Sequence, residues 1–145
     1  MSVNDEPIWM NYYREGMQFF SAAIKPGKKR IFTPILIYNI ACMSIEKLFM
    51  AFFFYNNRMP ENHTMRDLIE SASKFRDIDK VLFDNMIFLD GFQDICPVYA
   101  CKTVMPGEDD MERTVETLFM VRDFVENALK IVTKKPGVLY ENNNT

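Results

Sequence analysis

Two residues of this chain, Arg58 and His63, lie close together and have side chains suited to chemistry on a phosphate ester. His63 is the only histidine of the chain. An imidazole can take a proton from a ribose 2′-hydroxyl, and a guanidinium can hold a phosphate and its growing charge. Glu61 lies between the two and would repel a phosphate. We therefore favour a structural role, in which His63 caps or packs at a helix start and Arg58 is a solvated cation at a helix end.

Glu46 and Lys47 are the only charged residues in the apolar run of residues 35–55. Neighbours on a helix lie about 100° apart, so these two do not pair with each other. A buried, unpaired carboxylate is costly, and Glu46 therefore needs a partner or water. The candidate partners are Arg14, Arg66 and Arg122. A structural ion pair is the simplest interpretation, and a polar pocket in a dimer cleft, formed by Glu46, Lys47 and Arg122, is the alternative.

The cysteines argue against both a disulfide framework and a metal site. Cys42, Cys96 and Cys101 are an odd set, which suits a reducing cytoplasm and predicts a cytoplasmic protein. Cys96 and Cys101 are the only close pair, and a single histidine leaves a zinc ion short of ligands. We find no glycine-rich phosphate loop, Ser/His/Asp set or paired carboxylates, so the sequence predicts no cofactor and no other class of enzyme.

Charge and hydropathy exclude two further classes of protein. A formal net charge of −3 argues against a broad DNA-binding surface. The one dense basic run, residues 25–30, is interpreted as a solvated loop rather than a phosphate-contacting patch. The apolar run of residues 35–55 carries a charged pair at its middle, which is costly in lipid, so we expect a core helix and no membrane span.

The elements that must position these residues are all predicted to be helices. Apolar periodicity and breakers indicate helices over residues 7–24, 34–57, 64–75, 80–89 and 109–134, with an irregular segment at 92–107. Thr33, Thr64 and Asp79 are the expected N-caps. The predicted fold is all-α, an antiparallel bundle of four to five helices. Residues 1–135 form its single domain, and residues 136–145 form a polar tail.

The second and third helices together resemble the HEPN (higher eukaryotes and prokaryotes nucleotide-binding) family. The resemblance is carried by residues 38–52, with Ala41 and the Glu46–Lys47 pair, and by residues 63–68, led by His63, and it is best over 35–75. It implies a helical bundle that is frequently homodimeric and cytoplasmic, often in toxin–antitoxin, defence or nucleotide-handling systems. Some members are metal-independent ribonucleases with an Arg, four to six residues, then a His.

The chain departs from those ribonucleases in where its matching pair lies. Their motif tends to lie late in the chain, whereas residues 93–114 here contain no histidine and only Arg113. Only Arg58 and His63 match the spacing. We therefore expect a module that dimerises and binds a partner protein, a nucleotide or RNA, without catalysis. The alternatives are a metal-independent ribonuclease using Arg58 and His63, and a generic helical scaffold protein.

A polar stripe on the apolar second helix suggests where a partner binds. It consists of Asn39, Met43, Glu46 and Met50, with Lys47 at its edge. The chain is also rich in large side chains, with 13 Phe and 11 Met. Large apolar groups that a small bundle cannot bury must cover an interface. We expect a homodimer with the second helix or the segment 92–107 at its interface.

Overall fold

The computed structural model describes residues 5–25, 33–92 and 105–131. These residues form the helices α1 (Ile8–Ile24), α2 (Pro34–Tyr55), α3 (Met65–Ser73), α4 (Lys80–Asp90) and α5 (Glu108–Leu129). No strand occurs within the described ranges. The predicted all-α helical bundle is confirmed. Cys96, Cys101 and the predicted tail lie outside the described residues.

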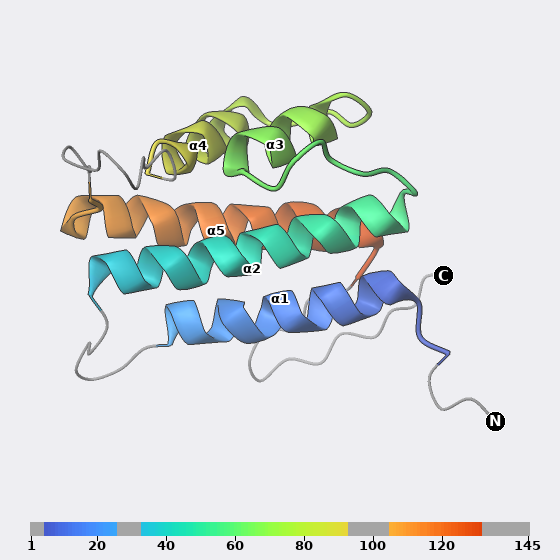
Figure 1. Ribbon diagram of the computed structural model, residues 1–145, viewed down its shortest axis with the longest axis horizontal. Helices are drawn as coiled ribbons and strands as arrows, with labels where there is room; N and C mark the ends of the chain where they lie inside the picture. Colours follow the sequence, from blue (N-terminus) through green and yellow to red (C-terminus); the bar gives the residue numbers. More distant parts are fainter. Residues whose placement is uncertain (1–4, 26–32, 93–104, 132–145) are drawn as a thin grey trace.

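The helices are arranged in layers around α2 (Figure 1). α1 covers one side of α2 and α5, and the antiparallel hairpin of α3 and α4 covers the other. α1 runs antiparallel to α2, as neighbouring helices joined by a short connection should. α2 and α5 run in the same direction, because the α3–α4 hairpin between them returns the chain to the end from which α2 starts. Three long helices therefore form the body of the bundle.

α2 is the central helix because it is apolar nearly all round. Twelve of its residues are buried, among them Phe49, Phe52 and Phe53, each 0% exposed. The rings of Phe49 and Phe52 contact Phe124 of α5 with centroids 5.9 Å and 5.1 Å apart. By length and composition alone, α2 could also cross a membrane. The rest of the bundle buries 61% of its most apolar 18-residue stretch.

Local hydrogen bonds and backbone conformations determine where α2 begins and ends. Thr33 caps its start, with its hydroxyl accepting from the Leu36 N–H at 3.3 Å, and Pro34 takes the first helical position as predicted. The helix ends at Tyr55, two residues before the predicted end. Asn57 adopts a left-handed φ of 57°, and the Arg58 N–H reaches back to the Phe53 carbonyl at 2.9 Å. This closure stops the helix.

α5 also ends earlier than predicted, at Leu129 instead of residue 134. Lys130 takes a left-handed φ of 62°, and the Ile131 N–H donates to the Glu126 carbonyl at 2.8 Å. The helix end was predicted at residue 134, whereas glycine is the usual left-handed residue at a helix end. A lysine in this conformation gives no such signal in the sequence.

α1 and α2 approach each other closely at Gly16. A Cβ atom at this position would lie 2.8 Å from Leu48 Cδ2 and 3.2 Å from the Leu48 backbone nitrogen. The Ser44 hydroxyl uses the same close approach and donates to the Gly16 carbonyl at 2.8 Å. Glycine is therefore required here by contact between helices and not by its backbone freedom.

Candidate functional site

Two of the predicted site residues come together in the folded chain, Glu46 and His63. The Nδ1 atom of His63 lies 2.6 Å from a carboxylate oxygen of Glu46. Glu46 lies past the middle of α2, and His63 lies in the turn just before α3, so the pair joins α2 to the start of α3. The His63 side chain is 53% exposed and that of Glu46 is 38% exposed. Water therefore has access to both groups.

The partner of Glu46 is thus His63 and none of the three candidate arginines. Arg14 pairs with Glu6 at 2.6 Å, and Arg66 lies against Glu70 and Asp90. The expected partners of Glu46 were all arginines, whereas the group that contacts it is the imidazole of His63 in the turn before α3. The sequence does not reveal this, since the turn at residues 56–64 decides which side chain returns to α2.

Arg58 is held by a different contact from His63. Its guanidinium lies 4.5 Å from the centroid of the Phe75 ring, beyond the C-terminal end of α3. His63 lies at the other end of that helix and faces Glu46. The two residues are close in sequence, yet the structure engages them with separate partners.

The alternative interpretation, a polar pocket in a dimer cleft, concerns three residues that have separate partners within this chain, and the first of them, Glu46, pairs with His63. Lys47 pairs with Glu15 of α1 at 3.0 Å, and this contact raises the pKa of its ammonium group. Arg122 packs its guanidinium 5.0 Å from the Phe20 ring and 5.2 Å from the Phe119 ring. Each residue therefore stabilises a different contact between helices.

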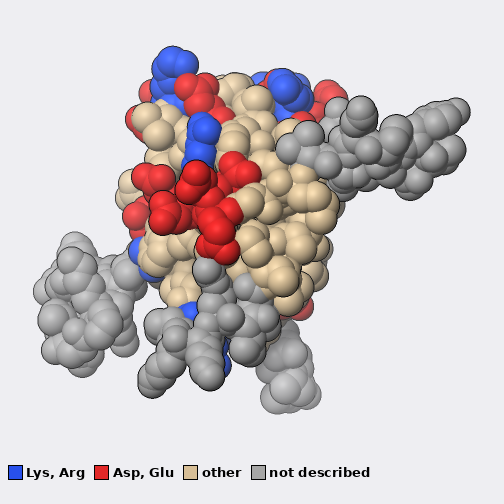
Figure 2. All heavy atoms as spheres, turned by 90° about the vertical axis from the view of Figure 1, so that its left-hand side faces the viewer, with Lys and Arg blue, Asp and Glu red and all other residues tan. Residues whose placement is uncertain are grey.

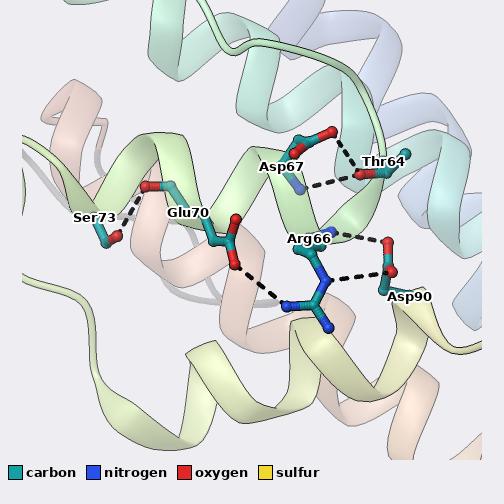
Figure 3. A network of polar contacts seen from close by, with 6 residues as sticks. All are labelled: Thr64, Arg66, Asp67, Glu70, Ser73 and Asp90. Carbon is teal, nitrogen blue, oxygen red and sulfur yellow. Dashed lines mark hydrogen bonds and ion pairs between the residues drawn. The ribbon is translucent and has the colours of Figure 1, made fainter.

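A polar network beside His63 holds α3 against α4 (Figure 3). The Thr64 hydroxyl accepts from the Asp67 N–H at 3.0 Å, which is the predicted N-cap of α3. The Arg66 N–H donates to Asp90 at 3.0 Å, and its guanidinium lies 3.8 Å from the same carboxylate and 3.3 Å from Glu70. The network thus locates the start of α3, and with it His63, relative to the end of α4.

The sequence did not predict the buried carboxylate of Glu126. Its side chain is 6% exposed, and it accepts a hydrogen bond from the Tyr13 hydroxyl at 2.5 Å. Arg122 Nε lies 4.0 Å from the same carboxylate. Burial, followed by the hydrogen bond to Glu126, raises the pKa of Tyr13 above its ordinary value. Glu126 follows the apolar residue Val125 in the sequence, and this position was the only available signal.

Cys42 is a buried thiol. It is 8% exposed and lies on α2 beside Tyr38, whose hydroxyl donates to the Leu89 carbonyl at 2.7 Å. Burial raises the pKa of the Cys42 thiol to about 12, and the carboxylates of Asp90 and Glu46 add to this effect. The thiolate is the reactive form of cysteine, so the fold suppresses the reactivity of Cys42.

We expect Cys42 to react with a maleimide at pH 8 at least about 100-fold more slowly in the folded protein than in urea, since a thiol pKa higher by two units or more lowers the thiolate fraction that much. The raised pKa means that the folded protein favours the neutral thiol. The burial of Cys42 therefore contributes fully to the free energy of unfolding below pH 9, and this contribution is lost as the pH rises toward 12. The measurement uses a variant with serine at Cys96 and Cys101. Rapid labelling of the folded variant would contradict the burial of Cys42.

The end of the molecule at which α5 begins is acidic. Figure 2 shows a group of Asp and Glu side chains on this end, and the first turn of α5 contributes Glu108, Asp109 and Asp110. Asp110 accepts from the Gly107 N–H at 2.9 Å and so caps the helix. A phosphate backbone would be repelled from this surface.

Comparison with known proteins adds no relative to this chain. No family model, no curated protein and no solved structure matches it. The resemblance to the HEPN family therefore rests on the sequence of residues 35–75, and the function is proposed from the geometry described above.

Proposed function

We propose that this chain is a helical module of the HEPN kind that pairs with a second copy and binds a partner protein, a nucleotide or RNA without catalysis. The observation that carries the non-catalytic part is the separate engagement of Arg58 and His63. A ribonuclease of this type needs the imidazole and the guanidinium to act on one phosphodiester. Here Glu46 holds the imidazole at 2.6 Å, while the guanidinium lies on the Phe75 ring.

The surface of α2 supports the pairing with a second copy. Met43 and Leu36 are 45% and 40% exposed on a helix that is otherwise mostly buried. Asn39 and Met43 of the predicted stripe are exposed, and Glu46 and Lys47 are partly exposed. Met50 does not belong to this surface, because it is 5% exposed and lies in the core. The stripe is therefore shorter than predicted and lies toward the start of α2.

One observation favours the second candidate, a metal-independent ribonuclease. A carboxylate that accepts a hydrogen bond from Nδ1 of a histidine fixes its tautomer and leaves Nε2 to act as a base. Glu46 and His63 have this arrangement, and Nε2 of His63 bonds to no described residue. In this case Glu46 would be the third residue of the site, and Arg58 would have to leave the Phe75 ring to reach a phosphate.

RNA cleavage in the presence of a chelator distinguishes the two functions. We expect a labelled single-stranded RNA to be cleaved no faster by the purified protein than by its His63→Ala variant. Loss of a positioned general base slows a reaction by at least about 100-fold, so a difference of that size would overturn the proposal and identify a ribonuclease. The variants Arg58→Ala and Glu46→Gln would then show which of the two residues acts with His63.

A further inference from the structure

Arg58 and Arg76 differ from the other described arginines in how their guanidinium groups are held. The guanidinium groups of the other four each donate a hydrogen bond or form an ion pair within the chain: Arg14, Arg66, Arg113 and Arg122. Within residues 5–25, 33–92 and 105–131, the guanidinium groups of Arg58 and Arg76 have no hydrogen-bond or ion-pair partner. Both contact aromatic rings instead.

The two guanidinium groups lie on one pair of stacked rings. Phe52 of α2 and Phe75, which follows α3, stack with ring centroids 5.4 Å apart and planes 14° apart. The guanidinium of Arg58 lies 4.5 Å from the Phe75 centroid, and that of Arg76 lies 5.7 Å from the Phe52 centroid. The attraction between a cation and a ring face holds both groups at the end of the bundle where α2 and α3 finish (Figure 1).

A guanidinium that lies against a ring keeps its N–H groups for another partner. The ring contacts the flat face of the group, whereas its five N–H donors lie in the plane and form a fork that matches an oxyanion. The ring contact also restricts the side chain, so less conformational entropy is lost when a ligand binds. Arg58 is exposed and Arg76 is partly exposed, so a ligand can reach both.

The charges near the stacked rings leave these two cations largely uncompensated. Lys74 lies 3.8 Å from Glu61, and this pair is neutral as a whole. Asp77 is the neighbour of Arg76 in the sequence, and the two arginines outnumber it. The acidic end of the molecule, where α5 begins, lies at the opposite end of the bundle (Figures 1 and 2). An anion is therefore attracted to the arginine pair even though the formal net charge of the chain is −3.

We propose that Arg58 and Arg76 bind the carboxylates of an acidic peptide segment in a partner protein. Recognition of acidic segments by clustered arginines is a recurring mode of peptide binding. A carboxylate and a guanidinium form short, charge-assisted hydrogen bonds that are frequently bidentate. This inference rests on the partner binding included in the proposed function, and it names the class of partner and the residues that bind it.

The surroundings of the arginine pair favour a peptide over RNA. Tyr55 is 37% exposed and Met59 is 53% exposed, and both are close to Arg58 in the chain, so they can contact an apolar side chain of the same peptide. RNA carries a charge at every nucleotide, and its affinity grows with the number of cations along its path. A peptide needs carboxylates only where it meets the two arginines.

Fluorescence anisotropy with the purified full chain tests this site. The probe is a labelled peptide of glutamates around a central leucine, and the same peptide with glutamines in place of the glutamates is the control ligand. Arg58→Gln and Arg76→Gln are each expected to weaken binding of the acidic peptide at least about tenfold, because each removes charged hydrogen bonds. Arg58→Lys keeps the charge but loses the fork, so its affinity should fall between those of the wild type and Arg58→Gln.

Arg113→Gln is the matched control variant. Arg113 also lies against a ring, 4.0 Å from the Phe88 centroid, but its Nε donates to Asn85 and it lies near the start of α5, at the other end of the bundle. Its loss removes the same charge and should change the affinity by less than about twofold. Thermal melting followed by circular dichroism checks that all the variants fold.

Each other outcome contradicts a distinct part of the proposal. Absence of peptide binding, binding that both glutamine variants leave unchanged, or an equal loss with Arg113→Gln would overturn the site. Tighter binding of a single-stranded RNA of the same net charge at the same salt concentration, lost in Arg58→Gln and Arg76→Gln, would overturn the acidic peptide as ligand and leave the proposed function intact. Cleavage of that RNA would overturn the proposed function and would not affect peptide binding.

Discussion

Replacing Gly16 by valine is expected to lower the free energy of unfolding by about 1–3 kcal/mol, the usual cost of forcing extra carbons into a packed contact. A Cβ atom at this position would lie 2.8 Å from Leu48 Cδ2 and 2.9 Å from Leu48 Cγ. The Leu48 side chain cannot simply move away, because the Leu48 backbone nitrogen lies 3.2 Å from the same point. The two helices must therefore separate, which also weakens the hydrogen bond from Ser44 to the Gly16 carbonyl.

Chemical denaturation of matched variants measures this effect. Gln18→Val adds a β-branched residue to the same helix at an exposed position and should change stability by less than about 0.5 kcal/mol. Gly16→Ala should destabilise less than valine, because alanine gains about 1 kcal/mol of helix propensity over glycine. Equal stability of Gly16→Val and the wild type would show that α1 and α2 do not make this close contact.

Removing the hydroxyl of Tyr13 is expected to destabilise the protein by about 1–3 kcal/mol, the cost of leaving a buried polar group without one of its partners. The Tyr13→Phe variant keeps the ring and its packing but takes away the donor that lies 2.5 Å from Glu126. The Glu126 side chain is 6% exposed, so water cannot readily replace the lost hydrogen bond. The expected loss is therefore larger than for a surface hydrogen bond.

Tyr12→Phe is the matched control, one residue away on the same helix. The Tyr12 ring stacks on Phe54 with centroids 5.1 Å apart, and its hydroxyl bonds to no described residue. Its loss should cost less than about 0.5 kcal/mol. A double-mutant cycle with Glu126→Leu isolates the coupling between Tyr13 and Glu126. If Tyr13→Phe and Tyr12→Phe unfold at the same denaturant concentration, the buried hydrogen bond contributes nothing.

The sequence predicted several residues of the candidate site, but it did not predict which of them contact each other. Glu46 and His63 were both selected because an ionisable group on an apolar helix and a lone histidine are unusual. Their contact at 2.6 Å was not predicted, since it depends on the path of the turn between α2 and α3. Arg58 and His63 were grouped by spacing, and the fold assigned them to different partners.

The sequence by itself determined the helices and most of their starts. Side-chain periodicity and caps such as Thr33 and Thr64 act within one or two turns, so local order along the chain is enough to predict them. Helix ends were less predictable, because Asn57 and Lys130 take left-handed conformations. Asparagine adopts this conformation more readily than most residues, whereas lysine rarely does. The surrounding packing must hold them there.

Only the tertiary structure decided which groups meet. The pairs of Glu46 with His63, Lys47 with Glu15, and Tyr13 with Glu126 each join residues from different elements, the last of them separated by 113 positions. Such contacts depend on the rotation of each helix about its axis, which the whole core sets at once through groups such as Gly16 and Leu48. No window of local sequence contains that information, because the free energy that selects the rotation comes from packing between helices.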